Sequence, residues 1–139
     1  MSVSVTSGRI PLLEEALSLY ESVGWTAYTR DPQLIQAALE GSTAVFCARD
    51  EAGALVGLAR ILSDGAAVTL VQDILVAPGQ HRSGVGSLLM DAVHEASQGI
   101  RQLVLFTDAE PGHRAFYEAN GLTEVHDLSS PGRAFVRYL

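Results

Sequence analysis

Apolar residues recur every three or four positions in two segments near the start of the chain. Residues 10–23 carry such a stripe, which predicts an amphipathic helix. Asp31 and Pro32 then supply a capping side chain and a first-turn proline for a second, shorter helix that Gly41 ends. Residues 24–29 lie between these helices, contain two aromatic residues and have no regular period, so they predict a loop.

Apolar runs that are rich in β-branched residues follow a different pattern and predict strands. The predicted strands of this part of the chain are residues 2–5, 43–49, 54–63 and 67–76. Turn residues separate the last three, so these should form an antiparallel meander. Gln72 and Asp73 stand side by side within the strand predicted over residues 67–76. Strict alternation would bury one of these polar side chains, which makes a local bulge plausible.

In the second half of the chain, predicted helices and strands alternate along the sequence. Residues 88–96 predict a helix, and residues 103–107 form a short apolar run typical of a buried strand. A helix between two strands makes them parallel. A further helix is predicted over residues 112–119, and residues 122–139 predict two short strands. The expected fold is therefore α/β, a mixed twisted sheet with an antiparallel meander, a splayed parallel β-α-β unit and helices on both faces.

Length, composition and charge bound the function. A chain of 139 residues, 47% of them apolar, suits a single domain over residues 1–139. The formal charge of −7 argues against nucleic acid as a partner, because such binding depends on basic side chains. Cys47 is alone and no signal-peptide or membrane-spanning pattern occurs, so a cytoplasmic protein without a membrane partner is expected.

The most informative motif is Gly84-x-Gly86, between the strand that ends at Val76 and a helix. Unpartnered backbone N–H groups at a helix N-terminus bind anions, and glycine lets a phosphate approach the backbone closely. A dinucleotide fingerprint would need a third glycine at Leu89, and a P-loop would need a lysine after Gly86, so both of these interpretations fail. Two glycines that only shape a loop remain an alternative.

The motif lies in a wider pattern. The order of strand, proline turn, residues 81–86, amphipathic helix and strand, followed by residues 115–122 (Ala-Phe-Tyr-Glu-Ala-Asn-Gly-Leu), resembles the GNAT superfamily of acyl-CoA-dependent N-acetyltransferases over roughly residues 43–125. Residues 24–28 and the following Asp-Pro are similar to a bacterial subgroup that resembles the plant arylalkylamine acetyltransferases. The family loop normally begins with Gln or Arg, where this chain has His81.

The resemblance implies a GNAT-like fold and acetyl-CoA as co-substrate. It implies that backbone groups of Ile74, Leu75 and Val76 pair with the pantetheine arm, while the loop holds the pyrophosphate. The expected residues of that loop are His81, Arg82, Ser83, Gly84, Val85, Gly86 and Ser87.

The chemistry implied is direct attack of a primary amine on the thioester in a ternary complex. A lysine-like amine has a pKa near 10.4, and holding it neutral at pH 7 costs about 4–5 kcal/mol, so a base or a water chain is needed. Asp108 and Asp73 are the candidates for that base or for anchoring the ammonium, although Asp108 could instead cap the next helix. Tyr117 matches the family tyrosine that protonates the departing thiolate.

Trp25 and Tyr28 lie in the loop that lines the acceptor cleft in this superfamily, and they could stack on an amine or pack in the core. The histidines show no metal-ligand spacing with Cys47, so no metal is predicted. The acceptor is a small amine or a protein lysine. A CoA-binding or partner-binding domain without catalysis remains the alternative function. Pairing of residues 134–139 with a second copy would make a homodimer.

Overall fold

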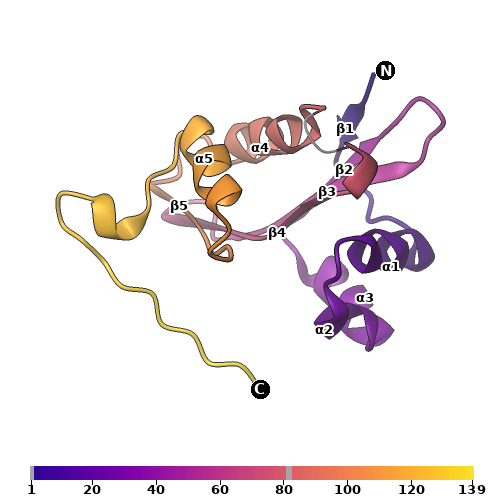
Figure 1. The fold of residues 1–139 in the computed structure, drawn as a ribbon, viewed down its shortest axis with the longest axis horizontal. Coiled ribbons are helices and arrows are strands. Elements are labelled where there is room, and N and C mark those ends of the chain that lie inside the picture. Colours follow the sequence, from indigo (N-terminus) through magenta and orange to yellow (C-terminus); the bar gives the residue numbers. More distant parts are fainter. Residues whose placement is uncertain (1, 81–82) are drawn as a thin grey trace. The chain divides into compact units, whose positions relative to one another are not determined.

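Five strands form one mixed sheet in the first of two compact units, Met1–Phe106 and Thr107–Leu139. The computed structural model describes residues 2–80 and 83–139, and Figure 1 shows its elements. The strands lie in the order of the sequence: β1 (Ser4–Thr6), β2 (Ala44–Arg49), β3 (Leu55–Ser63), β4 (Val68–Val76) and β5 (Gln102–Leu105). Neighbours from β1 to β4 are antiparallel, and β4 and β5 are parallel. The predicted meander and β-α-β unit are confirmed.

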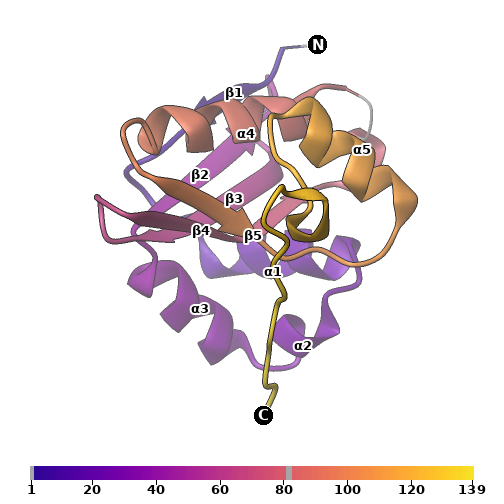
Figure 2. The ribbon, with the colours of Figure 1, turned by 90° about the vertical axis from the view of Figure 1, so that its left-hand side faces the viewer.

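Helices cover both faces of this sheet, as predicted. The helices of the first unit are α1 (Leu13–Ser22), α2 (Thr26–Thr29), α3 (Pro32–Gly41) and α4 (Val85–Ala96), and η1 (Pro78–Gln80) is a single 3₁₀ turn. Figure 2 shows α1 and α3 on one face and α4 on the other. Each face has its own core: α1 and α3 bury Tyr20 and Ile35 against Leu58, whereas α4 buries Val85 and Leu89 against other sheet residues.

The bulge predicted in the third strand of the meander is present. Arg60 of β3 pairs with Asp73 of β4, but the next residue, Ile61, pairs with Val71. Gln72 is therefore the extra residue of β4, and its side chain is exposed while those of Val71 and Asp73 are buried. The bulge removes the conflict between an apolar run and two adjacent polar residues, because only one of them faces the core.

The second unit consists of helix α5 (Pro111–Ala119), the 3₁₀ turn η2 (Val125–Asp127) and an extended tail. The two strands predicted within residues 122–139 do not form, which corrects that part of the sequence prediction. A strand needs a hydrogen-bonded neighbour, and none of the described strands pairs with these residues. Most of their apolar side chains are exposed instead, and Phe135 is 86% exposed.

The segment between α1 and α3 contains a short helix, and a side chain caps α3. The segment predicted as a loop contains the four-residue helix α2, whose length is too short for an apolar period to reveal it. Asp31 caps α3 as predicted, because its side chain accepts a hydrogen bond from the backbone N–H of Leu34. Among the described residues, no helix has both the length and the apolar character that crossing a membrane requires.

Candidate functional site

The N-terminus of α4 begins at Gly84, which has φ of +85°. A side chain in this left-handed conformation costs about 1–2 kcal/mol, so glycine favours the turn that starts the helix. No atom of the described residues would lie within 4 Å of a Cβ atom at Gly84, so none of them fills the space beside this residue. The first-turn N–H groups of the helix, which include those of Gly86 and Ser87, have no carbonyl partner within the helix. This end of α4 can therefore receive an anion.

The structure describes part of the loop before α4. Predicted binding residues His81 and Arg82 lie outside the described residues. Ser83 is exposed, and its hydroxyl donates a hydrogen bond to the carbonyl of Gln80 in η1. Val85 is 1% exposed, so it anchors the helix in the core and can offer a ligand only its backbone.

A residue that the sequence interpretation missed sets how closely α4 approaches the sheet. A Cβ atom at Gly57 of β3 would lie 2.9 Å from Cγ1 of Val85 and 3.1 Å from Cδ1 of Leu89. Real Cβ atoms essentially never come as close as 2.9 Å to another atom, so any larger residue at this position would force Val85 to shift. Gly57 thus positions the helix whose N-terminus begins at Gly84.

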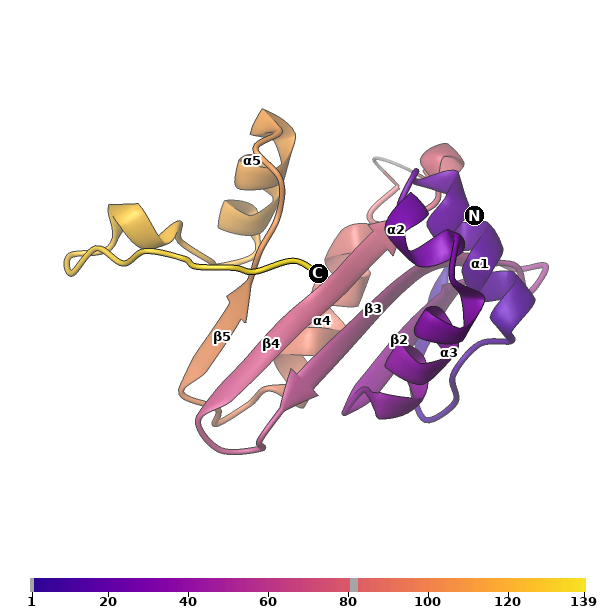
Figure 3. The same cartoon turned by 90° about the horizontal axis from the view of Figure 1, so that it is seen from below.

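Strand β4 supplies the other predicted binding surface. Its parallel ladder with β5 stops at the pair Val71 and Leu105, but β4 continues to Val76. Figure 3 shows that β4 is the longer strand and extends past the end of β5. On its other side β4 stays paired with β3, and Leu75 pairs with Leu58. The residues predicted to bind pantetheine, Ile74 to Val76, are therefore those that follow the bulge and lie beyond the end of the β5 ladder.

Asp73 lies in a buried network of polar side chains. Asp73 is 4% exposed, and its Oδ2 atom is 2.5 Å from Nε of Arg60, which is 6% exposed. The hydroxyl of Tyr20 donates to Oδ2 of Asp73 at 2.8 Å, and that of Tyr28 donates to Oδ1 at 3.1 Å. Nη2 of Arg60 donates to the hydroxyl oxygen of Tyr28 at 3.2 Å. Both carboxylate oxygens are therefore already occupied.

The charges in this network follow from burial and from the partners. Burial raises the pKa of the Tyr20 hydroxyl well above its usual range, and the charge of Asp73 adds to the effect. The same two causes raise the pKa of Tyr28. Burial acts to lower the pKa of Arg60, but the charge of Asp73 and its hydrogen bond outweigh burial and raise it. At neutral pH the phenols are thus neutral and Arg60 carries its charge.

Trp25 and Tyr28, the predicted acceptor-binding residues, pack around Tyr20. The ring centroids of Tyr20 and Trp25 are 5.8 Å apart, and those of Tyr20 and Tyr28 are 5.0 Å apart. Both residues are partly buried against the core on the α1 face. Each therefore has core contacts and some exposed surface, and Tyr28 also links the short helix α2 to β4 through Asp73.

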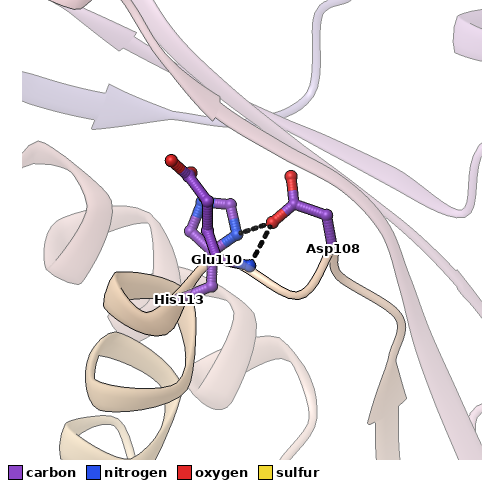
Figure 4. Close-up of side chains that lie close together, drawn as sticks. All are labelled: Asp108, Glu110 and His113. Atoms are coloured by element: carbon purple, nitrogen blue, oxygen red, sulfur yellow. Dashed lines mark hydrogen bonds and ion pairs between the residues drawn. The ribbon is translucent and has the colours of Figure 1, made fainter.

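In the second unit, Asp108, Glu110 and His113 lie close together before and within the first turn of α5, as Figure 4 shows. Nδ1 of His113 is 2.7 Å from Oδ1 of Asp108 and 2.9 Å from Oγ1 of Thr107. Nε2 of His113 is 3.5 Å from Oε2 of Glu110. Oδ1 of Asp108 also accepts a hydrogen bond from the backbone N–H of Glu110 at 3.0 Å. Asp108 is not the cap of α5, because the N-cap residue is Glu110 and no side chain caps this helix. Its bond to the N–H of Glu110 instead orders the turn before the helix.

Tyr117, the predicted acid, lies on α5 and packs edge-on against Phe116, with ring centroids 4.9 Å apart. Burial, and then the charge of Asp108, raises the pKa of Tyr117 to about 12. Its hydroxyl is therefore protonated at neutral pH and can donate a proton. The structure thus relates two predicted residues of this unit, Asp108 and Tyr117, electrostatically.

The sequence interpretation missed Tyr20 and Arg60, and it did not assign a role to His113. A charged residue within the apolar run of β3 was the available signal for Arg60, since such a residue needs a partner when it is buried. Tyr20 gave no signal, because it falls on the apolar stripe of α1 like a core residue. The spacing of Asp108, Glu110 and His113 is visible in the sequence, but their contacts depend on the turn before α5.

Comparison with known protein families identifies the family to which this chain belongs. The model of the acetyltransferase (GNAT) domain family matches residues 41–124, which is more than half of the chain. The match includes β2 to β5, the loop before α4, and α5. A search of curated proteins found no match.

Several solved structures share the fold. A GNAT-family acetyltransferase from Streptococcus pneumoniae is 29% identical, with a TM-score of 0.83 and coverage of 98% of each chain. A GNAT-family protein from Xanthomonas campestris is 28% identical, with a TM-score of 0.71 and coverage of 98% of this chain and 94% of its own. The aminoglycoside N-acetyltransferase AAC(6')-Iy, solved with a bisubstrate analogue of CoA, is 20% identical, with a TM-score of 0.69 and coverage of 100% and 99%.

Proposed function

The chain belongs to the GNAT family of acetyltransferases, and from that premise we propose that it moves the acetyl group of acetyl-CoA to a primary amine. The transfer proceeds by direct attack of the amine on the thioester in a ternary complex. One observation carries the proposal: β4 runs past the end of the β5 ladder, and the strand leads through a short turn into a helix whose N-terminus begins at Gly84. A split strand and an anion-binding helix end suit the two halves of CoA.

In this proposal the N-terminus of α4 holds the pyrophosphate. The N–H groups of Val85, Gly86 and Ser87 point outward from the first turn, and the helix dipole favours a negative charge there. Ser83, His81 and Arg82 complete the loop around the phosphates. The related fold of AAC(6')-Iy, which was solved with a CoA analogue, supports a coenzyme of this kind.

The pantetheine arm pairs with β4 as an added strand. Backbone groups of Ile74, Leu75 and Val76 supply the hydrogen bonds, in the way that an extended peptide adds to a sheet edge. The N–H near Leu75 polarises the thioester carbonyl, and a donor aimed at a developing oxyanion typically contributes about 10²–10³-fold in rate. The bulge at Gln72 is the irregularity from which this edge begins.

Proton transfer is assigned to the second unit. Tyr117 donates a proton to the departing thiolate, and its raised pKa of about 12 keeps it protonated until then. The base is assigned to the segment around Asp108. We give Asp73 a positioning role, because its carboxylate is buried and already accepts hydrogen bonds from Tyr20, Tyr28 and Arg60.

The acceptor amine contacts the aromatic residues of the α1–α2 segment. Trp25 and Tyr28 offer ring faces that attract a cation or stack on an aromatic group. A net charge of −7 favours a cationic acceptor as well. The acceptor is a small amine or a lysine side chain, and a screen of amines that follows the release of CoA thiol distinguishes these classes.

Binding of the coenzyme is tested by thermal unfolding with and without acetyl-CoA. A ligand at 100 times its dissociation constant stabilises the folded state by about 2.7 kcal/mol, so a clear rise in Tm is expected. NAD is the control, because it carries a pyrophosphate but no pantetheine arm, and it should give a much smaller rise. A protein that acetyl-CoA does not stabilise at millimolar concentration would sink the proposal.

Catalysis is tested by Tyr117→Phe, with Tyr138→Phe as a matched control at a side chain that is 87% exposed. Loss of the acid should lower turnover by about 10²–10⁴-fold while stabilisation by acetyl-CoA stays unchanged. Equal turnover in both variants would remove Tyr117 from the mechanism. A protein that binds acetyl-CoA but releases no thiol with any amine would instead be a binding domain.

We also propose a cytoplasmic location and a homodimer. The buried free thiol of Cys47 supports a reducing compartment. The exposed apolar side chains of Phe135, Val136 and Tyr138 support pairing of the last residues with a second copy. Sedimentation tests the dimer, and a mass equal to one chain would exclude it.

A further inference from the structure

The imidazole of His113 lies between two carboxylates at the start of α5, as Figure 4 shows. Asp108 contacts Nδ1 at 2.7 Å and Glu110 contacts Nε2 at 3.5 Å. An Nδ1–H that donates to Asp108 leaves the lone pair of the neutral ring on Nε2. The His113 side chain is 40% exposed, so its ring can exchange protons with solvent. This is the arrangement in which a carboxylate orients an imidazole that acts as a base.

His113 and Tyr117 share one face of α5. The half-buried residues of this segment are His113, Phe116, Tyr117 and Asn120, and the helical residues between them are exposed. Side chains four residues apart on a helix are neighbours, with Cβ atoms about 5–6 Å apart. Asp108 contacts His113 and its charge also acts on Tyr117. His113 and Tyr117 are therefore neighbours on this face of α5.

The carboxylate of Asp108 alone is poorly suited to take a proton from the acceptor ammonium. An ordinary carboxylate of Asp is a weaker base than an ordinary imidazole by about 2.6 pKa units, so an ammonium gives up its proton to imidazole more readily. An efficient base also has a proton affinity suited to neutral pH, where imidazole is the usual choice among side chains. Asp108 then orients the ring, and Asp108 together with Glu110 stabilises the imidazolium that forms.

We propose that His113 is the catalytic base of the acetyl transfer, with Asp108 as its positioning residue; the inference rests on the proposed function. Nε2 of His113 takes one proton from the acceptor ammonium. The freed lone pair attacks the thioester carbon, the C–N bond forms and the C–S bond breaks, and the thiolate takes the proton of Tyr117. The tyrosinate recovers a proton from the new amide nitrogen, and the imidazolium releases its proton to solvent. One ammonium and one acetyl-CoA thus give one amide, one CoA thiol and one proton.

A purely structural role makes a different prediction. Asp108 also accepts the backbone N–H of Glu110, so the cluster could serve only to order the turn before α5. A glutamine at position 113 can keep a hydrogen bond to Asp108 but cannot accept a proton at neutral pH. Under a structural role His113→Gln would keep most of its turnover, whereas under the proposed role it loses turnover while it remains folded.

The chain offers a matched control in His126. This imidazole also lies between two carboxylates, with Nδ1 3.2 Å from Oε2 of Glu124 and Nε2 3.5 Å from Oδ1 of Asp127. It lies in η2 and not on the α5 face that carries Tyr117. His126→Ala therefore removes a similar ion-paired histidine of the same unit without touching the proposed base.

The experiment measures kcat/KM by thiol release for the wild type, His113→Ala, His113→Gln and His126→Ala, each without and with added imidazole. We expect both His113 variants to lose about 10²–10⁴-fold and His126→Ala to stay within two-fold. Free imidazole should restore part of the activity of His113→Ala in proportion to its concentration, a result that a structural role does not produce. The Tm of His113→Gln should equal that of the wild type, which would show that folding is intact.

Three outcomes would overturn the inference. They are a His113→Gln variant with more than a tenth of wild-type activity, a His113→Ala variant that imidazole does not restore, and a loss in His126→Ala equal to that in His113→Ala. In each case wild-type turnover and stabilisation by acetyl-CoA leave the proposed function standing. A wild type without turnover would overturn the proposed function, and this inference with it.

Discussion

Replacing Asp73 with Asn should destabilise the protein severely. The ion pair with Arg60 is nearly inaccessible to solvent, and removing one partner of a buried pair leaves the other charge uncompensated, which typically costs about 3–5 kcal/mol. The total stability of a domain is about 5–15 kcal/mol, so this one change removes about a fifth of it or more. The substituted amide also turns N–H donors toward groups that need an acceptor.

The effect can be expressed as a melting temperature. Unfolding entropies near 2.1 cal/mol/K per residue imply that each kcal/mol shifts the Tm of a chain of 139 residues by about 3.4 °C. Asp73→Asn should therefore lower Tm by about 10–17 °C, measured by circular dichroism or differential scanning calorimetry. Asp91→Asn is the control, because Asp91 is an exposed carboxylate of the same unit.

A double variant tests whether the loss comes from the uncompensated charge of Arg60. Replacing Arg60 with Met and Asp73 with Leu removes both charges, and apolar replacements of buried pairs are often neutral or stabilising. We expect the double variant to recover most of the Tm that Asp73→Asn loses. An Asp73→Asn variant within about 1 kcal/mol of the wild type would refute the reasoning, since it would show that Arg60 keeps water or finds another partner.

The remaining predictions concern one tyrosine and two glycines. The pKa of Tyr20 is raised in the folded state, so as pH rises above about 10 only the unfolded chain ionises this residue. The free energy of unfolding should therefore be constant up to about pH 10 and fall above it by up to about 1.4 kcal/mol per pH unit. Urea unfolding at several pH values measures this, and Tyr20→Phe should show a shallower fall. Gly57→Ala should lower the free energy of unfolding by about 1–3 kcal/mol, because the added methyl group overpacks against Val85 and Leu89. It should also weaken acetyl-CoA binding, because it displaces the start of α4, and an unchanged affinity by calorimetry would contradict this. Gly84→Ala should cost about 1–2 kcal/mol from its positive φ alone, and urea unfolding that shows no loss would refute the strain.

Local patterns of the sequence accounted for most elements of the first unit. Apolar spacing predicted α1, the turn residues predicted the meander, and the adjacent Gln72 and Asp73 predicted the bulge, because each of these depends on residues close together in the chain. The pattern failed at α2, which is shorter than one apolar period can reveal, and over residues 122–139. There the β-like composition was present, but a strand also needs a neighbour, and composition does not supply one.

The site divides in the same way. The glycine motif and the resemblance it carries identified the family and predicted the segments around Gly84 and Tyr117. They did not predict that Asp73 would be held by Arg60 and Tyr20, residues that lie 13 and 53 positions away. The pair with Arg60 depends on the register that the bulge sets between β3 and β4, and the bond from Tyr20 depends on how α1 packs on the sheet.

The sequence by itself determined the order of the strands and of the longer helices in the first unit, the glycine turn before α4 and the family, because short-range spacing and backbone chemistry decide these. Only the tertiary structure decided which polar groups meet: Asp73 became a buried partner of Arg60, and His113 came to lie against Asp108. The physical reason is that the strength and role of a charged group depend on its burial and on its neighbours within a few ångströms, and folding chooses those neighbours.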